Sequence, residues 1–271
     1  ALILFPVWGS FVIPYIVAYF ILFFDVYWCY KSFSLAINAY IASKKIKKAE
    51  QTNWLKKLEK LPDYKKVKHV LIIPNYKENL SKLRQTIQSI AAQTLPTKQI
   101  FVVLGMEKRE TEGMKKANFL IKEFKNRFGD IFATYHPDID GEIKGKSSNE
   151  SYASKKAYRK LIKTGTIDIN LTTVSSVDAD SVFDSQYFSY LSYAFLTDDK
   201  RYNKFWQSAN VNHNNFWTVP APVRIIAFFG SLWRTALLVQ KDRLISNSTY
   251  SLSFSLLKKI GFWDTDAIPE D

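Results

Sequence analysis

The sequence predicts an α/β fold, a mostly parallel sheet with helices on both faces, preceded by an N-terminal transmembrane helix. Three observations predict it. Short apolar runs alternate with helical patterns from residue 67 onward, 47% of the 271 residues are hydrophobic, and no charged residue occurs from Ala1 to Phe24. These features divide the chain into an anchor (1–43), a basic juxtamembrane linker (44–66) and one α/β domain (67–271).

The anchor is long and apolar enough to cross a bilayer, since only Asp25 and Lys31 are charged before Lys44. Tryptophans and tyrosines near its ends and flanks suit the two membrane interfaces. A cleaved signal peptide is disfavoured because no basic region precedes the apolar run and no small-residue cleavage site follows it. The sequence therefore favours a transmembrane anchor.

The linker region is strongly basic. From Lys44 to Lys68 there are ten lysines and three acidic residues, which leaves +7 of the chain's formal +13. Such an excess beside a span places the following domain on the cytoplasmic face of the cell membrane and attracts anionic lipid. Nucleic-acid binding is the competing interpretation, but the juxtamembrane position already accounts for the lysines. The single cysteine, Cys29, excludes an intrachain disulfide and a cysteine-based zinc site.

Four strands alternate with helices in the α/β domain. The strands are expected at 67–74, 99–104, 131–135 and 169–177, and the helices at 82–93, 114–128, 147–163 and 186–196. Parallel strands place their carboxyl ends along one edge, where ligands of such sheets bind. The residues expected to gather there are Pro74 to Glu78, the Gly105 turn, His136 to Asp140, and Asp178 to Asp180.

The alternation loosens beyond Thr197. Residues 204–209 are expected to form another strand. Residues 223–239 are apolar enough to suggest a second span, but Arg224, Arg234 and an aromatic face favour an amphipathic helix in the membrane interface.

The Asp178-Ala179-Asp180 segment follows the fourth expected strand. Two carboxylates one residue apart at the mouth of a buried strand are costly unless a cation lies between them and a ligand. A solvated turn after a strand is the simpler explanation of such a pair. The other motifs favour the cation.

Four segments occur in a characteristic order: Ile73-Pro74-Asn75-Tyr76-Lys77-Glu78, Gly145-Lys146-Ser147-Ser148-Asn149, Asp178-Ala179-Asp180 and Glu270-Asp271. With them, residues 67–271 resemble the membrane-anchored family 2 glycosyltransferases, which have a GT-A (Rossmann-like) fold. The resemblance implies an inverting hexosyltransferase that moves sugar from a nucleotide-diphospho-sugar to a lipid-linked or polysaccharide hydroxyl, in polysaccharide biosynthesis.

The resemblance also implies the donor side of the site. Pro74, Asn75 and Glu78 would meet the nucleoside, Asp138 or Asp140 would contact the donor, and Lys146 with Asn149 would lie at the diphosphate. Asp178 and Asp180 would hold Mg²⁺ or Mn²⁺. Glu78 could instead be a helix N-terminal carboxylate, and Lys146 a surface lysine.

Asp271, next to Glu270, would be the general base that takes the acceptor proton. Gln207, His213, Ser248 and Thr249 would lie on the acceptor side, although a lone histidine is more often structural. The Q-x-x-R-W motif of processive synthases is absent, because Gln240 to Leu244 ends in leucine and precedes Glu270-Asp271. Processivity and polymer export are therefore unsupported.

Three other classes compete with this interpretation. Gly141 to Ser147 resembles a P-loop but has three residues, not four, before the Gly-Lys pair. Asp178 could be the first, nucleophilic residue of a haloacid-dehalogenase-like phosphatase motif. That motif normally begins its domain, whereas three strand–helix units precede Asp178. A catalytically silent membrane scaffold with the same fold is the third.

Overall fold

The computed structural model describes residues 4–211, 216–240 and 249–266. The chain forms two compact units. The apolar unit consists of residues 1–49 and 209–245, and the α/β unit consists of residues 50–208 and 246–271. The domain boundaries expected at residues 43 and 66 stay predictions.

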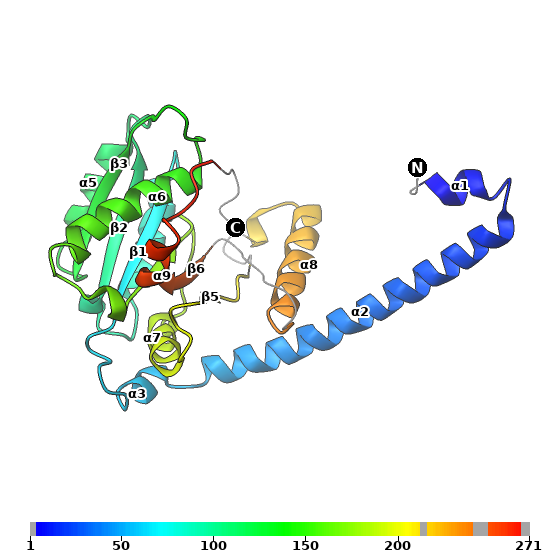
Figure 1. Cartoon of the computed structure of the whole chain (residues 1–271), viewed down its shortest axis with the longest axis horizontal. Helices are drawn as coiled ribbons and strands as arrows, with labels where there is room; N and C mark the ends of the chain where they lie inside the picture. Colours follow the sequence, from blue (N-terminus) through cyan, green and yellow to red (C-terminus); the bar gives the residue numbers. More distant parts are fainter. Residues whose placement is uncertain (1–3, 212–215, 241–248, 267–271) are drawn as a thin grey trace. The chain divides into compact units, whose positions relative to one another are not determined.

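The α/β unit is built on one six-stranded sheet (Figure 1). The strand order is β3-β2-β1-β4-β6-β5, so successive strands are added on one side of β1 up to β3 and on its other side from β4 onward. β6 is antiparallel to both of its neighbours. The strands are β1 (Lys68–Asn75), β2 (Ile100–Glu107), β3 (Asp130–His136), β4 (Thr172–Ser176), β5 (Phe205–Gln207) and β6 (Tyr250–Ser253). The predicted mostly parallel sheet is confirmed.

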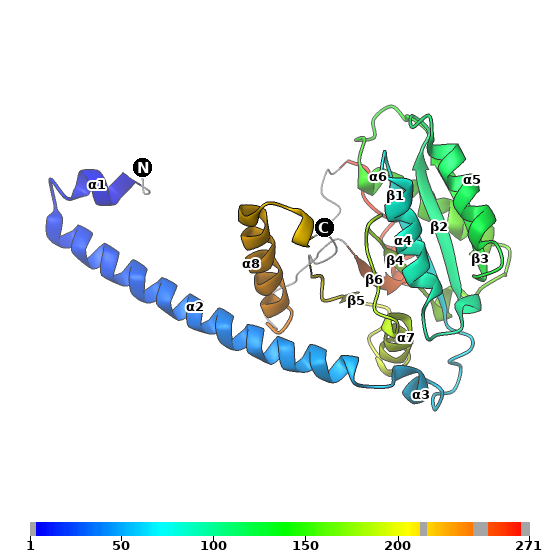
Figure 2. The same cartoon turned by 180° about the vertical axis from the view of Figure 1, so that it is seen from behind.

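Helices cover both faces of the sheet, which Figures 1 and 2 show from opposite sides. One core lies between the sheet and α3, α4, α5 and α7, and includes Leu71, Ile87 and Phe188. The other lies between the sheet and α6 and α9, and includes Ile72, Ala153 and Phe254. The helices are α3 (Trp54–Leu58), α4 (Leu80–Ala91), α5 (Gly113–Phe124), α6 (Lys146–Ala157), α7 (Tyr187–Thr197) and α9 (Phe254–Lys259).

Neighbouring residues of β1 belong to different cores because strand side chains alternate between the two faces of a sheet. β1 pairs in parallel with β2 and β4, so both of its faces are buried. This explains the continuous apolar run in its sequence.

Several elements differ from the sequence-based expectation. α5 ends at Phe124, and β4 begins at Thr172 after a 3-10 turn, Ile169–Leu171. β2 extends to Glu107, so Gly105, expected in a turn, lies inside the strand. The helix expected to reach residue 163 ends at Ala157 and continues as a π-helical turn, Tyr158–Ile162. The antiparallel strand β6 was not predicted; it pairs β4 from Thr173 to Ser176.

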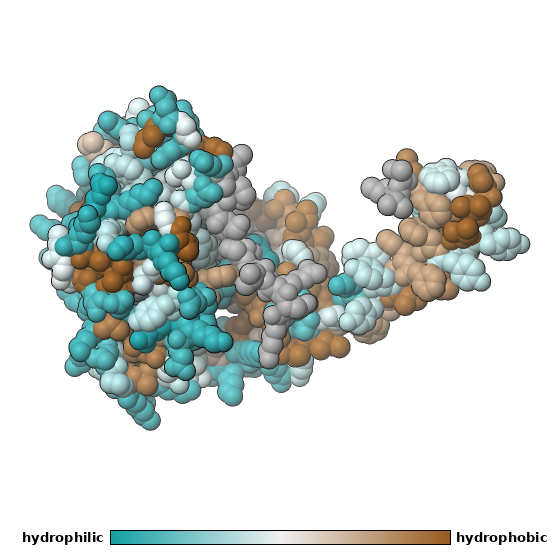
Figure 3. Space-filling view, in the orientation of Figure 1, coloured by the Kyte–Doolittle hydropathy of each residue, from teal (hydrophilic) through white to brown (hydrophobic). Residues whose placement is uncertain are grey.

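The apolar unit contains α1 (Phe5–Gly9), α2 (Pro14–Glu50) and α8 (Ala221–Leu237). In the described part of the chain, α2 is the one helix whose length and composition would allow it to cross a membrane. It has 37 residues, and at about 1.5 Å per residue it is longer than the roughly 30 Å hydrocarbon core. Brown, apolar residues are frequent on the apolar unit, whereas the face of the α/β unit that is shown has mainly polar residues (Figure 3).

Candidate active site

The Asp178-Ala179-Asp180 segment follows β4, and Ala179 and Asp180 lie in a turn that the Ser181 N–H closes by donating to the Asp178 carbonyl at 3.0 Å. Val177 continues the β4 ladder, since its N–H donates to the Ile72 carbonyl at 3.0 Å. Val177 and Ala179 are buried in the α4–α7 core, and the Ala179 carbonyl accepts from Thr86 Oγ1 at 2.9 Å. Asp178 is partly exposed and Asp180 is exposed. Burial of the two apolar residues therefore leaves both acidic residues at the surface.

Lys146 pairs with the first of these acidic residues. Its Nζ donates to Asp178 Oδ1 at 2.8 Å, and the two side chains are 21% and 36% exposed. Lys146 is the first residue of α6, and no side chain caps the helix at Gly145. Among the described residues, no atom lies within 4 Å of a Cβ added at Gly145, so none of them fills the space beside this helix end. An open, uncapped helix N-terminus with a lysine suits an anion.

Two residues expected on the acceptor side lie beside the same segment. Thr249, just before β6, accepts from the Asp178 N–H through Oγ1 at 3.5 Å and hydrogen-bonds Ser181 Oγ at 3.1 Å. Gln207, at the end of β5, donates from Nε2 to the Thr249 carbonyl at 3.2 Å. The β4–β6–β5 pairing thus connects Gln207 to Asp178 through Thr249.

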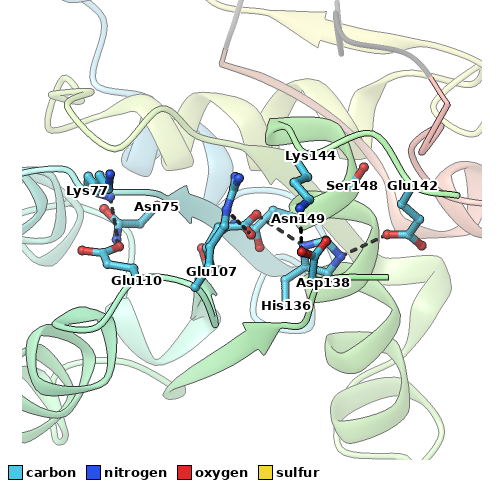
Figure 4. Close-up of polar contacts among 12 residues, drawn as sticks. Asn75, Lys77, Glu107, Glu110, His136, Asp138, Glu142, Lys144, Ser148 and Asn149 are labelled. Carbon is cyan, nitrogen blue, oxygen red and sulfur yellow. Dashed lines mark hydrogen bonds and ion pairs between the residues drawn. The ribbon is translucent and has the colours of Figure 1, made fainter. Parts of the chain in front are cut away.

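A buried carboxylate organises the loop after β1. Glu110 Oε2 accepts from Asn75 Nδ2 at 2.8 Å and from the Lys77 N–H at 3.0 Å (Figure 4). Glu110 Oε1 accepts from Lys116 Nζ at 2.6 Å. Lys77 has a φ of 63°, a conformation uncommon for a non-glycine residue, which this network supports. Glu110 therefore fixes the end of β1 at Asn75 and the loop that follows it, which contains Glu78.

A second buried cluster lies at the ends of β2 and β3. His136 contacts Glu107 Oε1 through Nδ1 at 3.3 Å and Glu142 Oε2 through Nε2 at 3.0 Å (Figure 4). Arg109 Nε lies 3.3 Å from Glu107 Oε2, and its guanidinium stacks 4.1 Å from the centre of the Tyr76 ring. These contacts connect the loops that follow β1, β2 and β3.

The N-terminal half of α6 buries polar residues against the sheet. Asn149 is 2% exposed and donates from Nδ2 to the Gly105 carbonyl at 2.7 Å. A Cβ at Gly105 would lie 2.9 Å from Asn149 Oδ1, so glycine allows this close approach. Glu150 is fully buried, and its Oε1 accepts from Ser176 Oγ at 2.6 Å. Polar contacts therefore fix α6, and with it Lys146, against β2 and β4.

The segment after α9 packs on the start of α6. The Ile143 N–H donates to the Thr265 carbonyl at 2.9 Å, and Ser147 Oγ donates to the Asp264 carbonyl. Glu270 and Asp271 lie outside the described residues, as do His213 and Ser248. From Asp266, five residues can span at most about 17 Å to Asp271.

The remaining predicted residues have their own contacts. Glu78 is 41% exposed, forms an ion pair with Lys82 at 3.6 Å, and its carbonyl accepts from Lys116. Asp138 pairs with Lys144 at 2.6 Å, and Asp140 is exposed in the same loop. Pro74 lies within β1, opposite Gly105. The structure brings together Lys146, Asp178, Thr249 and Gln207, and the roles of all these residues stay predictions.

Sequence reasoning missed Glu107, Glu110 and Glu142. The sequence-based strand ended at Leu104 and therefore left Glu107 out. Because β2 continues through Gly105, Glu107 lies at the carboxyl end of the strand, at the edge where the other candidate residues lie. Glu110, which is buried, and Glu142, which is partly buried, lie in loops, where no periodicity marks such residues.

Asp178 and Asp180 fit a divalent cation that is shared with another ligand. Their carboxylate oxygens are the ligand type that Mg²⁺ and Mn²⁺ prefer. Within residues 4–211, 216–240 and 249–266, no group of three or more His, Cys, Asp or Glu side chains is placed to hold a metal. Two carboxylates leave most coordination positions of such a cation to other ligands, such as a diphosphate and water.

No protein-family model and no curated protein sequence matches the chain. Among solved structures, a mannosyltransferase from Pyrobaculum calidifontis in complex with GDP-Man and Mn²⁺ is 14% identical, with a TM-score of 0.49 over 86% of this chain. S. aureus TarS, also solved with UDP, is 12% identical, with a TM-score of 0.41 over 76% of this chain, or 75% for the UDP complex.

This chain spans 60% of the mannosyltransferase chain and 51% of the TarS chain.

Proposed function

We propose that the protein is a membrane-anchored, metal-dependent, inverting glycosyltransferase of family 2 that uses a nucleotide-diphospho-sugar. The observation that carries the proposal is the group at the carboxyl end of β4: Lys146 at an open helix N-terminus, paired with Asp178, and Asp180 exposed two residues later. An ammonium and backbone N–H groups attract a diphosphate, and two carboxylates attract the cation that accompanies it.

The donor side follows from this arrangement. Asp178 and Asp180 would hold Mg²⁺ or Mn²⁺, which when bound neutralises charge on the leaving nucleotide. The β1 loop, fixed by Glu110, would present Asn75 and the neighbouring backbone to the nucleoside. The strand order reverses between β1 and β4, the usual position of a ligand crevice in an open α/β sheet.

The acceptor would enter beside Gln207 and Thr249. Its hydroxyl oxygen attacks the anomeric carbon, the bond from that carbon to the diphosphate oxygen breaks, and the diphosphate leaves with the electron pair. The Asp271 carboxylate takes the hydroxyl proton, and a single displacement inverts the anomeric centre. The Asp264–Thr265 contacts with α6 support this assignment because they bring the chain that leads to Asp271 close to the candidate site.

The membrane part of the proposal rests on the apolar unit. α2 would anchor the chain, and Lys44 to Lys48 near its end would face the cytoplasm and anionic lipid. α8 exposes Ile226, Phe229 and Trp233 and would lie in the interface. A lipid-linked or glycan acceptor suits such an enzyme.

Calorimetric titration of UDP, GDP and their sugar conjugates with Mn²⁺ tests the proposal on the full chain and on Asp180→Ala. Wild type is expected to bind one nucleotide class in a metal-dependent way, and Asp180→Ala is expected to lose this binding. Asp199→Ala, which removes an exposed acid in the turn after α7, is the matched control.

Failure of the wild type to bind any of these nucleotides with Mn²⁺ would contradict the proposal. Release of phosphate from phosphomonoesters would point instead to the phosphatase.

A further inference from the structure

The Lys146–Asp178 ion pair occupies a carboxylate that the proposed function needs for a metal. Asp178 Oδ1 accepts from the Lys146 ammonium at 2.8 Å, and both side chains are partly shielded from water. A carboxylate oxygen that accepts from an ammonium has fewer lone pairs left for a cation. The positive charge of Lys146 also repels any divalent cation that approaches Asp178.

Both partners are held where they meet. Lys146 begins α6, which is fixed to the sheet by the Asn149–Gly105 and Glu150–Ser176 hydrogen bonds. Asp178 lies between Val177 and Ala179, whose burial fixes the backbone on both sides. The lysine side chain, in contrast, has several rotatable bonds and can turn from Asp178 toward the open space beside Gly145.

We propose that Lys146 is a resident cation that hinders a divalent metal at Asp178 until a diphosphate draws its ammonium away. A diphosphate at the N-terminus of α6 offers the lysine a second anion, and the metal then takes the place of the ammonium at Asp178. Metal and nucleotide therefore bind cooperatively, and each increases the affinity for the other by the same factor. The inference rests on the proposed function and adds that the diphosphate favours metal binding at Asp178.

The inference makes a prediction for the metal alone, without nucleotide. Lys146→Met is expected to bind Mn²⁺ about tenfold tighter than wild type, because the competing ammonium is gone. Adding UDP or GDP is expected to tighten Mn²⁺ binding to wild type at least about fivefold, and to have a smaller effect in Lys146→Met. Lys146→Arg keeps the charge and is expected to bind Mn²⁺ alone as weakly as wild type.

Lys144→Met is the matched control. Lys144 lies two residues earlier and pairs with Asp138 at 2.6 Å, with both side chains more than half exposed (Figure 4). Its removal changes the net charge by the same amount but leaves Asp178 paired. We expect its affinity for Mn²⁺ alone to stay within about twofold of wild type, since exposed charges are well screened.

The measurement is Mn²⁺ titration of the full chain and the three variants, by calorimetry and by the electron paramagnetic resonance signal of free Mn²⁺. Thermal melts establish that each variant is folded, and Lys146→Gln replaces Lys146→Met if the latter is not. The inference is overturned if Lys146→Met binds Mn²⁺ no tighter than wild type, or if Lys144→Met gains as much.

The inference and the proposed function can fail separately. Metal-dependent nucleotide binding by wild type, together with equal Mn²⁺ affinity in wild type and Lys146→Met, would overturn the inference and leave the function in place. Absence of nucleotide binding would overturn the function, while tighter Mn²⁺ binding by Lys146→Met would still support the competition at Asp178. Absence of Mn²⁺ binding in every protein would overturn the inference.

Discussion

Two groups of charged side chains lie at the same edge of the sheet and differ in how they are satisfied. At the ends of β1, β2 and β3, Glu107, Glu110 and His136 are buried and bonded to other side chains or backbone groups. At the end of β4, Asp178 and Asp180 remain accessible, and Asp178 pairs with the flexible side chain of Lys146. Acidic residues at one edge of the sheet therefore differ in burial between β2, with the loop after it, and the segment after β4.

The difference separates positioning from binding. A buried carboxylate with several donors is costly to disturb, so the first group is suited to holding loops in place. A partly exposed carboxylate that can exchange one cation for another is suited to a ligand. The comparison predicts that substitutions in the first group act on stability, and substitutions in the second act on binding.

The largest effect is expected from Asp178→Ala. Loss of a proposed metal ligand should reduce metal-dependent nucleotide affinity by at least about 100-fold. Even substitution of a residue that only hydrogen-bonds to a metal ligand lowers metal affinity by about 10- to 100-fold. Calorimetry measures the affinity, and a thermal melt should show little change because Asp178 is partly exposed. A large loss of stability without a loss of binding would remove the distinction between the two groups.

Glu110→Gln should act in the opposite way. It removes the charge of a buried carboxylate that accepts hydrogen bonds from Asn75, the Lys77 N–H and Lys116. The Lys116 ammonium then has no carboxylate at Glu110 to pair with. We expect a loss of about 3 kcal/mol in the free energy of unfolding, measured with urea. Glu112→Gln, in an exposed pair with Lys115, is the control and should cost less than about 0.5 kcal/mol. Similar costs for the two variants would contradict the positioning role.

A buried histidine in the middle of the sheet extends the comparison to pH. His69 hydrogen-bonds Thr173 and Ser192, and burial, with a smaller contribution from Lys68, lowers its pKa to about 3. Above pH 6.5 the imidazole is neutral in both states, so it gives no pH dependence. Between pH 6.5 and 3 the unfolded chain binds a proton that the folded chain does not, and stability falls as pH falls.

The expected loss from His69 is about 1.5 kcal/mol between pH 6.5 and 5. Urea unfolding at several pH values, compared with His69→Gln, isolates this contribution. The variant is expected to have a shallower dependence over the same range. Parallel pH profiles for the two proteins would show that His69 is not the source.

The smallest effect is expected from Glu142→Gln. Glutamine keeps an oxygen near His136 Nε2 but removes the charge, and the Glu142 side chain is 23% exposed. We expect a loss of about 1 kcal/mol in unfolding free energy and unchanged metal-dependent nucleotide affinity. Glu59→Gln, at an exposed position, is the stability control. A marked loss of affinity would move the Glu142 loop from the positioning group to the binding group.

Hydrophobic periodicity predicted most of the α/β unit. The run from Val67 to Pro74 corresponds to β1, because a strand buried on both faces has apolar residues at successive positions. The Leu83, Ile87 and Ile90 stripe corresponds to the buried face of α4, because helical residues three and four apart share a face. The short strand β6 was missed, since Tyr250–Ser253 contains two serines and its partner β4 is far away in the chain. Ser251 pairs with Ser175, which lies 76 residues earlier.

The sequence by itself determined the alternation of strands and helices, the apolar N-terminal helix, and the position of Asp178 and Asp180 just after a strand. These follow from local spacing and hydrophobicity. Only the tertiary structure decided that Lys146 pairs with Asp178, that Thr249 and Gln207 lie beside them, and that Glu110 holds the β1 loop. Such contacts depend on strand order and register, which join residues far apart in the chain and leave no local pattern.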